Sequence, residues 1–483
     1  MMQLPVVADP EADNDWLLYT LDVLAPLTGL AVRFSLVAPG ELSGSGPALW
    51  YGVVPEDPGD EVILIPRRPE FRPGKMQQVE MACGSEDLDA ILIYTDTIDP
   101  DAGSEEISFD LFYNVFAYVS CLEEYEQECR LGPLHSYALR TGGNTDRFDR
   151  PYATLLARGV AATITRKLTT PPSPVDAQPA LHLTHDVDLI AKKGVTRLKE
   201  GVFRTANVVR SLFQARFGDA ATGLRDAMRM IFGRADYLFI DEMAEMEKQY
   251  GFRSAYNLFS GVRPSGSAAA RLRHYLFDPP YDPSTHPVLP GILQRRAVEG
   301  WEVGVHFAFD VWRDAERMRR ELQAVERVLD CRHTVTTCRQ HWLRFSLAET
   351  WRAHHAAGIE VDTTLGFNDR PGFRAGVVSP FRPYDHAAGR AHPLWVVPTI
   401  LMDTHLFHYG NLTEQSAREA VIDRLLDEVV HCRGEAAVIW HTHVFSTDHQ
   451  WQHEYRYILE RMMALGMASR LPSGVILKER SDD

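Results

Sequence analysis

Five groups of polar side chains that could do chemistry follow short apolar runs after residue 180. The first group is THDVD at residues 184–188. Residues i and i+2 of an extended strand point to the same face, so the carboxylates of Asp186 and Asp188 can share one site. Two neighbouring carboxylates repel each other. A divalent cation relieves the repulsion by binding one carboxylate while the other serves as a base. An inert Asp-rich loop is the alternative interpretation.

The other four groups combine histidine, arginine, aspartate and tryptophan. His306 and Asp310 are four residues apart, a spacing that brings two metal ligands to one side where the chain turns helical. Arg339 can hold a carboxylate through two hydrogen bonds, and the ring of Trp342 can stack on a sugar. The last two groups are DTTLGF at 362–367, followed by the loop RPGFRAG with Arg370 and Arg374, and WHTH at 440–443. A lone histidine is more often structural than catalytic, but five such groups in order favour one site.

Short strand-like runs alternate with helical stretches through residues 181–483. The runs are LHLTHDVDL, GWEVGVHFAF, TVTTC, GIEVDTTLGF, LWVVPTIL and AAVIWHTHVF. This β–α alternation predicts an α/β fold with a parallel sheet, closed or partly closed into a barrel. The C-terminal ends of barrel strands open onto one face, so we expect the five polar groups to converge there.

Charge is unevenly distributed along the chain, whose net charge is −16. Residues 1–150 contain 27 acidic and 9 basic residues, a net of −18, and the remainder contains 39 acidic and 41 basic residues, a net of +2. With the Pro-rich stretch LTTPPSPVDAQPA, this shift predicts an acidic N-terminal α/β domain at 1–150, a Pro-rich linker at 151–180 and the barrel at 181–483. Eighteen of the 19 histidines follow residue 150, so metal or acid–base chemistry is expected in the barrel.

Residues 191–235 interrupt the alternation and predict a helical insertion. They contain ten basic and three acidic residues, a net of +7. One interpretation is a surface for anionic glycans or lipid headgroups. The other is a helical pair that packs on the acidic first domain and needs no ligand.

Composition excludes several classes of protein. The overall negative charge argues against a nucleic-acid partner. The chain has no run of about 20 apolar residues, so no transmembrane segment is expected, and its first residues lack the pattern of a signal peptide. The six cysteines form no CxxC pair, which fits reduced thiols. We therefore expect a cytoplasmic protein, with peripheral membrane contact through 191–235 as an alternative.

The order Asp-x-Asp, His, Arg, Asp, His resembles the polysaccharide deacetylases of carbohydrate esterase family 4. THDVD, RQHWLRF, DTTLGF and GFRAG resemble more closely a bacterial subgroup with an extra N-terminal domain. FDLFYNVFAYVSCLEEYEQE followed by GGNTDRFDRPYATL resembles that extra domain. The resemblance implies a partly irregular β/α barrel that removes acetyl groups from N-acetylated sugars using a divalent metal, commonly zinc.

The resemblance also implies a role for each matching residue. Asp186 corresponds to the catalytic base, Arg339 to the arginine that orients it, and His441 to the general acid. Asp188 and His306 correspond to metal ligands. Asp362 matches an acidic residue of the fourth motif more loosely, and the expected substrate contacts are Trp342, Arg374 and Trp440. A backbone N–H near Trp342 is expected to stabilise the oxyanion together with the metal.

Two positions depart from the family pattern. The second metal histidine, four residues after the first, is replaced by Asp310, and the proline of the Arg-x-Pro-aromatic motif is replaced by His341. Either Asp310 or His341 could complete the metal site. The sequence therefore predicts a metal-dependent carbohydrate deacetylase acting on a cytoplasmic glycan precursor. A catalytically inactive barrel that binds glycan is the alternative.

Overall fold

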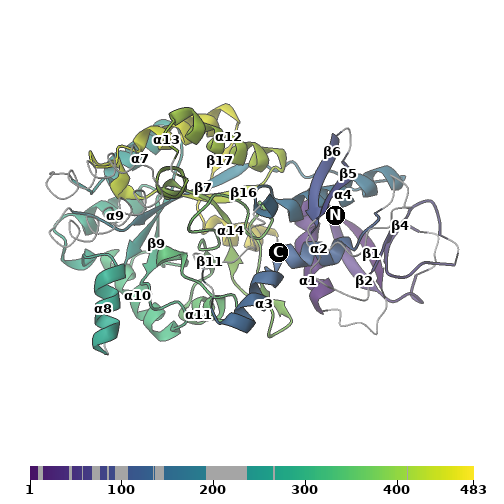
Figure 1. Ribbon diagram of the computed structural model, residues 1–483, viewed down its shortest axis with the longest axis horizontal. Helices are drawn as coiled ribbons and strands as arrows, with labels where there is room; N and C mark the ends of the chain where they lie inside the picture. Colours follow the sequence, from purple (N-terminus) through teal and green to yellow (C-terminus); the bar gives the residue numbers. More distant parts are fainter. Residues whose placement is uncertain are drawn as a thin grey trace, which may run out of the picture.

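The computed structural model has two parts side by side, an N-terminal lobe and a larger barrel (Figure 1). It describes residues 1–8, 15–42, 46–56, 58–67, 77–83, 86–92, 107–133, 135, 146–191, 236–264, 267–410 and 412–482, of which 77–83, 86–92 and 479–482 are described by backbone alone. The predicted helical insertion at 191–235 falls outside the described residues except for Ala191.

The N-terminal lobe contains a parallel sheet in the order β2-β1-β3-β4. Its strands are β1 (Met2–Ala8), β2 (Val32–Val37), β3 (Ala48–Tyr51) and β4 (Val62–Ile65). Its helices are α1 (Asp15–Thr28), α2 (Leu111–Val119), α3 (Leu122–Leu131) and α4 (Tyr152–Lys167), with a short 3₁₀ turn η1 (Asp146–Phe148). An antiparallel hairpin of β5 (Gln77–Cys83) and β6 (Glu86–Leu92) lies beside α4. The α/β character expected for this part is present.

The barrel is built from parallel strands in the order β14-β11-β10-β9-β8-β7-β16-β15. The strands are β7 (Ala180–Val187), β8 (Ala255–Phe259), β9 (Glu302–Phe307), β10 (Thr337–Gln340), β11 (Val361–Asp362), β14 (Trp395–Val396), β15 (Thr399–Met402) and β16 (Glu435–Ile439). A short strand β17 (Ala468–Ser469) also pairs with β7.

The two ends of this strand order belong to one segment, which closes the ring. β14 pairs with β11, and β15, which begins three residues after β14 ends, pairs with β16. Between them, the N–H of Val397 donates to Asp362 O, and Pro398 O accepts from Ala437 N–H. Pro398 has no N–H of its own, which accounts for the break between β14 and β15. The prediction of a partly irregular β/α barrel is confirmed.

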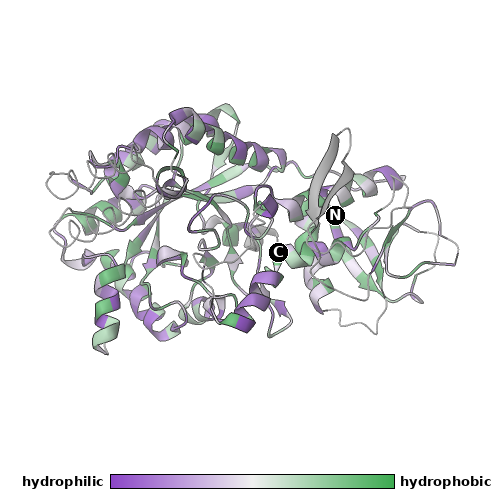
Figure 2. Ribbon diagram, viewed as in Figure 1, coloured by the Kyte–Doolittle hydropathy of each residue, from purple (hydrophilic) through white to green (hydrophobic). Residues whose placement is uncertain are grey.

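Helices cover the outside of the barrel. They are α7 (Ile240–Gln249), α8 (Ala268–Phe277), α9 (Leu289–Val298), α10 (Ala315–Val328), α11 (Thr350–Ala357), α12 (Gln415–His431), α13 (Gln452–Ala464) and α14 (Gly474–Asp482). Hydrophilic and hydrophobic residues alternate along α12 and α13, as expected for helices with one face on the strands (Figure 2). Shorter elements complete the barrel: η2 (Pro283–Thr285), η3 (His341–Leu343), β12 (Tyr384–Asp385), β13 (Arg390–Ala391), η4 (His405–Tyr409) and η5 (Thr442–Phe445).

Residues 151–180, which the sequence assigned to a linker, contain both ordered helix and irregular chain. Residues 152–167 form α4, which packs on α1 and α2 with Leu156 and Val160 fully buried. The Pro-rich part that follows has neither helix nor strand until β7 begins at Ala180. The domain limits read from composition stay a prediction. No helix among the described residues is both long and apolar enough to span a membrane.

Candidate active site

Strand register brings the predicted residues onto the inner face of the barrel. Asp186 of β7 pairs with Asn257 of β8, and His306 of β9 pairs with Arg339 of β10. Side chains alternate between faces along a strand, so Val187 points the opposite way, where it packs among the apolar residues under the helices. The inner face therefore collects polar groups from four neighbouring strands.

Asp186 is held as an ionised carboxylate by two donors. Arg339 Nη1 donates to Asp186 Oδ1 over 2.8 Å, and Asn257 Nδ2 donates to the same oxygen over 2.9 Å. Arg339 is fully buried and also donates to Thr184 Oγ1 and to Thr363 O. Burial opposes ionisation of Asp186, but the charge of Arg339 outweighs it and lowers the pKa to about 2. The second oxygen, Oδ2, lies 3.9 Å from His306 Nε2.

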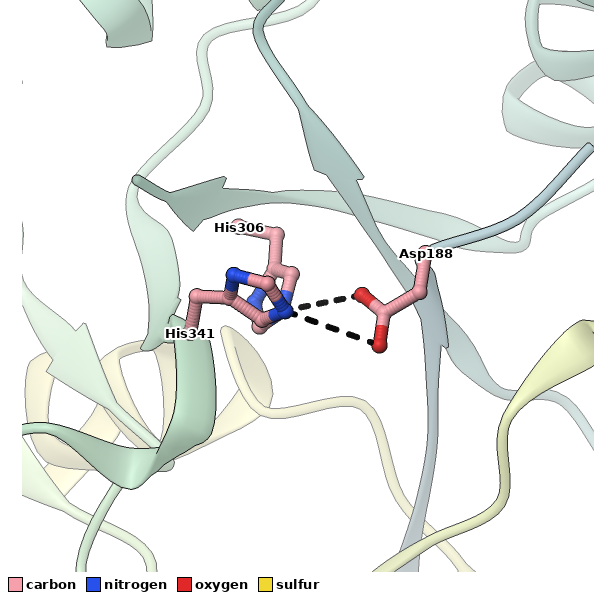
Figure 3. A group of neighbouring side chains, drawn as sticks. All are labelled: Asp188, His306 and His341. Atoms are coloured by element: carbon pink, nitrogen blue, oxygen red, sulfur yellow. Dashed lines mark ion pairs between the residues drawn. The ribbon is translucent and has the colours of Figure 1, made fainter. Parts of the chain in front are cut away.

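Asp188 directly after β7, His306 of β9 and His341 in the turn after β10 converge (Figure 3). His306 Nε2 lies 3.2 Å from Asp188 Oδ1, and His341 Nε2 lies 3.8 Å from Asp188 Oδ2. His306 Nδ1 donates to Arg339 O, so the lone pair of its Nε2 faces the carboxylate. These three residues are called the Asp-His-His cluster below.

The Asp-His-His cluster fits a divalent metal. Tetrahedral zinc has ligand bonds of about 2.0–2.2 Å, which place ligand atoms about 3.3–3.5 Å apart, close to the separations seen here. Asp188 Oδ1 and His306 Nε2 are buried without a hydrogen-bond partner among the described residues, which is costly unless a cation binds them. Two imidazoles and one carboxylate also suit zinc, and three protein ligands leave a position open for water. Burial opposes protonation of His341, but Asp188 and Asp278 raise its pKa to about 9, so the surroundings attract positive charge.

Of the two residues that the sequence left open as third ligand, only His341 lies in the cluster. Asp310 instead pairs with Arg273 and Arg344. His341 is oriented from behind by Asp278, whose Oδ1 lies 3.4 Å from His341 Nδ1. Asp278 Oδ1 also accepts a hydrogen bond from Phe309 N.

His441 also lies near Asp188, and its imidazole contacts a buried aspartate, Asp403. Its Nε2 lies 3.5 Å from Asp188 Oδ2. Its Nδ1 lies 3.0 Å from both oxygens of Asp403, and its backbone N–H donates to Asp403 Oδ2 over 2.7 Å. Burial opposes protonation of His441, but Asp403 and Asp188 outweigh it and raise the pKa to about 10. This imidazole is therefore a cation that can donate a proton.

Trp342 lies at the rim of the site. It directly follows His341, its side chain is 38% exposed, and its φ of 60° is in the left-handed region. Its ring contacts Phe277 edge-on, with the centroids 6.3 Å apart. The sequence assigns this ring to stacking on a sugar, which stays a prediction.

Three other predicted site residues point away from the cluster. Asp362 pairs in register with Cys338, one residue before the inward-facing Arg339, and so it faces the helices. There it accepts hydrogen bonds from Trp351 Nε1 and Thr364 N. The catalytic role expected for Asp362 is therefore not supported by its position.

The substrate contacts expected for Arg374 and Trp440 are not supported either. Arg374 is buried in an ion pair with Glu124 of α3, at 2.8 Å, because this loop packs against the N-terminal lobe. Trp440 is fully buried and packs on Tyr455 of α13, because it precedes the inward-facing His441 by one residue. Both side chains hold parts of the fold together.

A second group of metal-ligating side chains, Cys338, His354 and Asp362, lies under α11. All three are fully buried, and Gln340 Nε2 donates to His354 Nε2 over 2.9 Å. Asp362 already accepts from Trp351 and Thr364. This group is a buried hydrogen-bond network on the outer face of the sheet.

Sequence reasoning missed three residues of the site: Asn257, Asp278 and Asp403. Asp403 directly follows β15, so it carries the same signal as the other groups, a polar residue at the end of an apolar run. Asn257 lies within an apolar strand, and Asp278 directly follows α8, where no strand-end pattern marks it.

No protein-family model and no curated protein sequence matches the chain. A structure described as a polysaccharide deacetylase from Mycobacterium smegmatis is 14% identical, covers 65% of this chain and 94% of its own, and has a TM-score of 0.37. The chitin deacetylase of Colletotrichum lindemuthianum is 10% identical, covering 62% of this chain and 88% of its own, with a TM-score of 0.31. Agd3, described as a carbohydrate deacetylase, is 8% identical, covering 98% and 86%, with a TM-score of 0.35. All three descriptions name a deacetylase.

Proposed function

We propose that the protein is a metal-dependent amide hydrolase that removes acetyl groups from an N-acetylated sugar. One arrangement supports this most directly: an ionised Asp186 and a cationic His441 both lie next to the Asp-His-His cluster. Amide hydrolysis needs a base for the attacking water and an acid for the leaving amine, and here the surroundings separate the two roles.

Asp188, His306 and His341 would hold the metal, with zinc the best fit to their donor atoms. Such a metal lowers the pKa of water and polarises a carbonyl oxygen. Asp310 has no part in this ligand set, because its carboxylate is already neutralised by Arg273 and Arg344.

Two side chains of the protein, Asp186 and His441, would carry out the proton transfers. Asp186 Oδ1 is occupied by Arg339 and Asn257, so Oδ2 is the oxygen that accepts the proton of the attacking water. The cationic His441 donates its Nε2 proton to the leaving amine, and Asp403 holds its Nδ1 so that Nε2 faces the substrate. The backbone N–H of Trp342, which lies in a left-handed turn directly after His341, would donate to the oxyanion, and the Trp342 ring would stack on the sugar.

Substrate and location remain predictions from the sequence. A cytoplasmic glycan precursor, lipid-linked or nucleotide-linked, is the proposed substrate class. Contact of residues 191–235 with anionic glycan or lipid is a separate hypothesis, tested by co-sedimentation with anionic vesicles at low and high salt.

Metal content and acetate release together test the function. Purified protein is analysed for metal, and acetate release from N-acetylated oligosaccharides is compared between wild type and Asp186→Asn. We expect bound metal in both proteins and a loss of activity of 10²-fold or more in the variant, as for removal of a general base. Asp427→Asn, an exposed aspartate on α12, is the matched control and should keep full activity.

The outcomes distinguish the proposed enzyme from the alternative, an inactive barrel that binds glycan. A metal-free protein that binds oligosaccharide without releasing acetate would establish the inactive glycan-binding barrel instead. Equal activity in wild type and Asp186→Asn would reject the proposed base.

A further inference from the structure

We propose that the N-terminal lobe positions two residues of the active site, His341 and Trp342. It does so because Glu128 and His135 of the lobe bind the backbone segment that directly follows these two residues. This inference rests on the proposed function for its catalytic consequence and on geometry alone for the contact. The backbone concerned is residues 344–348, called the clamp segment below. It directly follows η3, which contains His341 and Trp342.

Glu128 of α3 holds the clamp segment with three hydrogen bonds. Leu347 N donates to its Oε2 over 3.1 Å, Ala348 N donates to its Oε1 over 3.3 Å, and the hydroxyl of Ser346 donates to Oε1. Glu128 is only 7% exposed. A buried carboxylate must be compensated by donors, and these donors come from the barrel rather than from the lobe itself.

His135 holds the same segment one residue earlier. Its Nδ1 donates to Phe345 O over 2.9 Å, and its Nε2 accepts from Arg344 Nε over 3.4 Å. These two bonds require the neutral imidazole with its proton on Nδ1. Arg344 also pairs with Asp310, the residue that replaces the second metal histidine in the sequence pattern. Asp310 therefore anchors the clamp segment instead of binding a metal.

The turn between the cluster and the clamp segment is strained. Trp342 and Leu343 have φ of 60° and 48°, although neither is glycine. Such a conformation persists only where the surrounding contacts determine it on both sides. On one side β10 is fixed by the barrel, with Arg339 bonded to β7 and to Thr363 O. On the other side the clamp segment is fixed by Glu128 and His135.

A second contact between lobe and barrel lies nearby. Glu124, one turn before Glu128 on α3, forms the buried ion pair with Arg374, whose Nη1 donates to Gly366 O. Figure 1 shows α3 between the lobe and the barrel. Simple docking of two domains would need only this kind of contact. The hydrogen bonds to residues 344–348 are different because these residues directly follow the turn that contains His341.

The test uses the full-length chain with Glu128→Gln, which removes the charge and one of the two acceptor oxygens. We expect hydrogen exchange of peptides covering 341–348 to accelerate by 10-fold or more, because the amides of Leu347 and Ala348 are bonded to Glu128. Zn²⁺ affinity, measured by chelator competition, should fall several-fold as His341 loses its position. For acetate release, kcat should fall while KM changes by less than about 2-fold.

Glu126→Gln, an exposed glutamate on the same helix, is the matched control and should leave all three measurements unchanged. If Glu128→Gln does not fold, Ser346→Ala removes a single bond of the same set and should give smaller changes in the same directions.

Unchanged exchange at 341–348 would overturn the proposal. Faster exchange with unchanged Zn²⁺ affinity and kcat would also overturn it, because the lobe would then hold the segment without fixing the site. If wild type releases no acetate, the proposed function fails, while exchange and Zn²⁺ affinity still decide the positioning role.

Discussion

At the scale of single residues, the site separates an acid from a base through different buried partners. Asp186 is paired with Arg339, and His441 is paired with Asp403. Each partner is itself fully buried, so solvent screens the charges little. The two groups can therefore lie next to the same cluster and still have opposite charges at neutral pH.

Asp403→Asn should leave less of His441 protonated at alkaline pH without unfolding the site. Asp403 raises the pKa of His441, so its removal lowers that pKa and the imidazole loses its proton at a lower pH. The basic limb of the kcat profile should move to lower pH by one unit or more, so kcat should fall at pH values between the new limb and the old one. An unshifted basic limb would mean that His441 is not the acid.

Asp278→Asn should weaken metal binding by about 10- to 100-fold, the usual effect of losing the partner of a ligating histidine. Asp278 orients His341 and is in turn bonded to His274 Nδ1 over 2.8 Å. Zn²⁺ affinity is measured by chelator competition, with Asp282→Asn, a nearby aspartate that caps η2, as the control. An affinity equal to that of wild type would show that His341 needs no support from Asp278.

At the scale of elements, side-chain alternation along the strands decides which predicted residues reach the site. Asp186 and Asp188 could be predicted because a long apolar strand with the spacing i, i+2 fixes their shared face. Asp362 could not, because β11 has only two residues and its register with β10 is set by packing. Asp278 follows a helix and reaches His341 only through the tertiary fold. The choice between Asp310 and His341 likewise depended on Arg273 and Arg344, whose positions no local pattern encodes.

The two tryptophans test this alternation. Trp440 packs under α13, so Trp440→Ala should lower the free energy of unfolding by about 3–5 kcal/mol. The milder Trp440→Phe should leave KM for the oligosaccharide unchanged. Trp342→Ala should change stability little and raise KM, because its exposed ring is the proposed sugar contact. Denaturant unfolding and steady-state kinetics separate the two effects, and a raised KM in Trp440→Phe would contradict the assignment.

At the scale of the whole molecule, buried neutral histidines link stability to pH. Four histidines have a pKa lowered to about 4, and burial is the largest cause in each case: His135, His182, His392 and His405. Between pH 6.5 and pH 4 the unfolded chain binds protons at these positions and the folded chain does not. The free energy of unfolding should therefore fall as the pH falls through this range, by up to about 1.4 kcal/mol per pH unit for each histidine.

His182 isolates one such contribution, because it lies at the end of the barrel where β7 begins. Denaturant unfolding of wild type and His182→Gln is compared at pH 7 and pH 5. The variant should lose less stability on acidification than wild type. Equal losses would show that His182 does not contribute to the pH dependence.

The closure of the barrel also determines when the site can exist during synthesis. β7 pairs with β16, which follows it by about 250 residues, and the closing segment 395–402 needs β16 for its second partner. Asp186 therefore leaves the ribosome more than 200 residues before Asp403 and His441. Until then one edge of β7 has no partner in β16 and is exposed to misfolding and to chaperones. A chain that stops before β16 leaves the barrel open and lacks His441, the proposed proton donor.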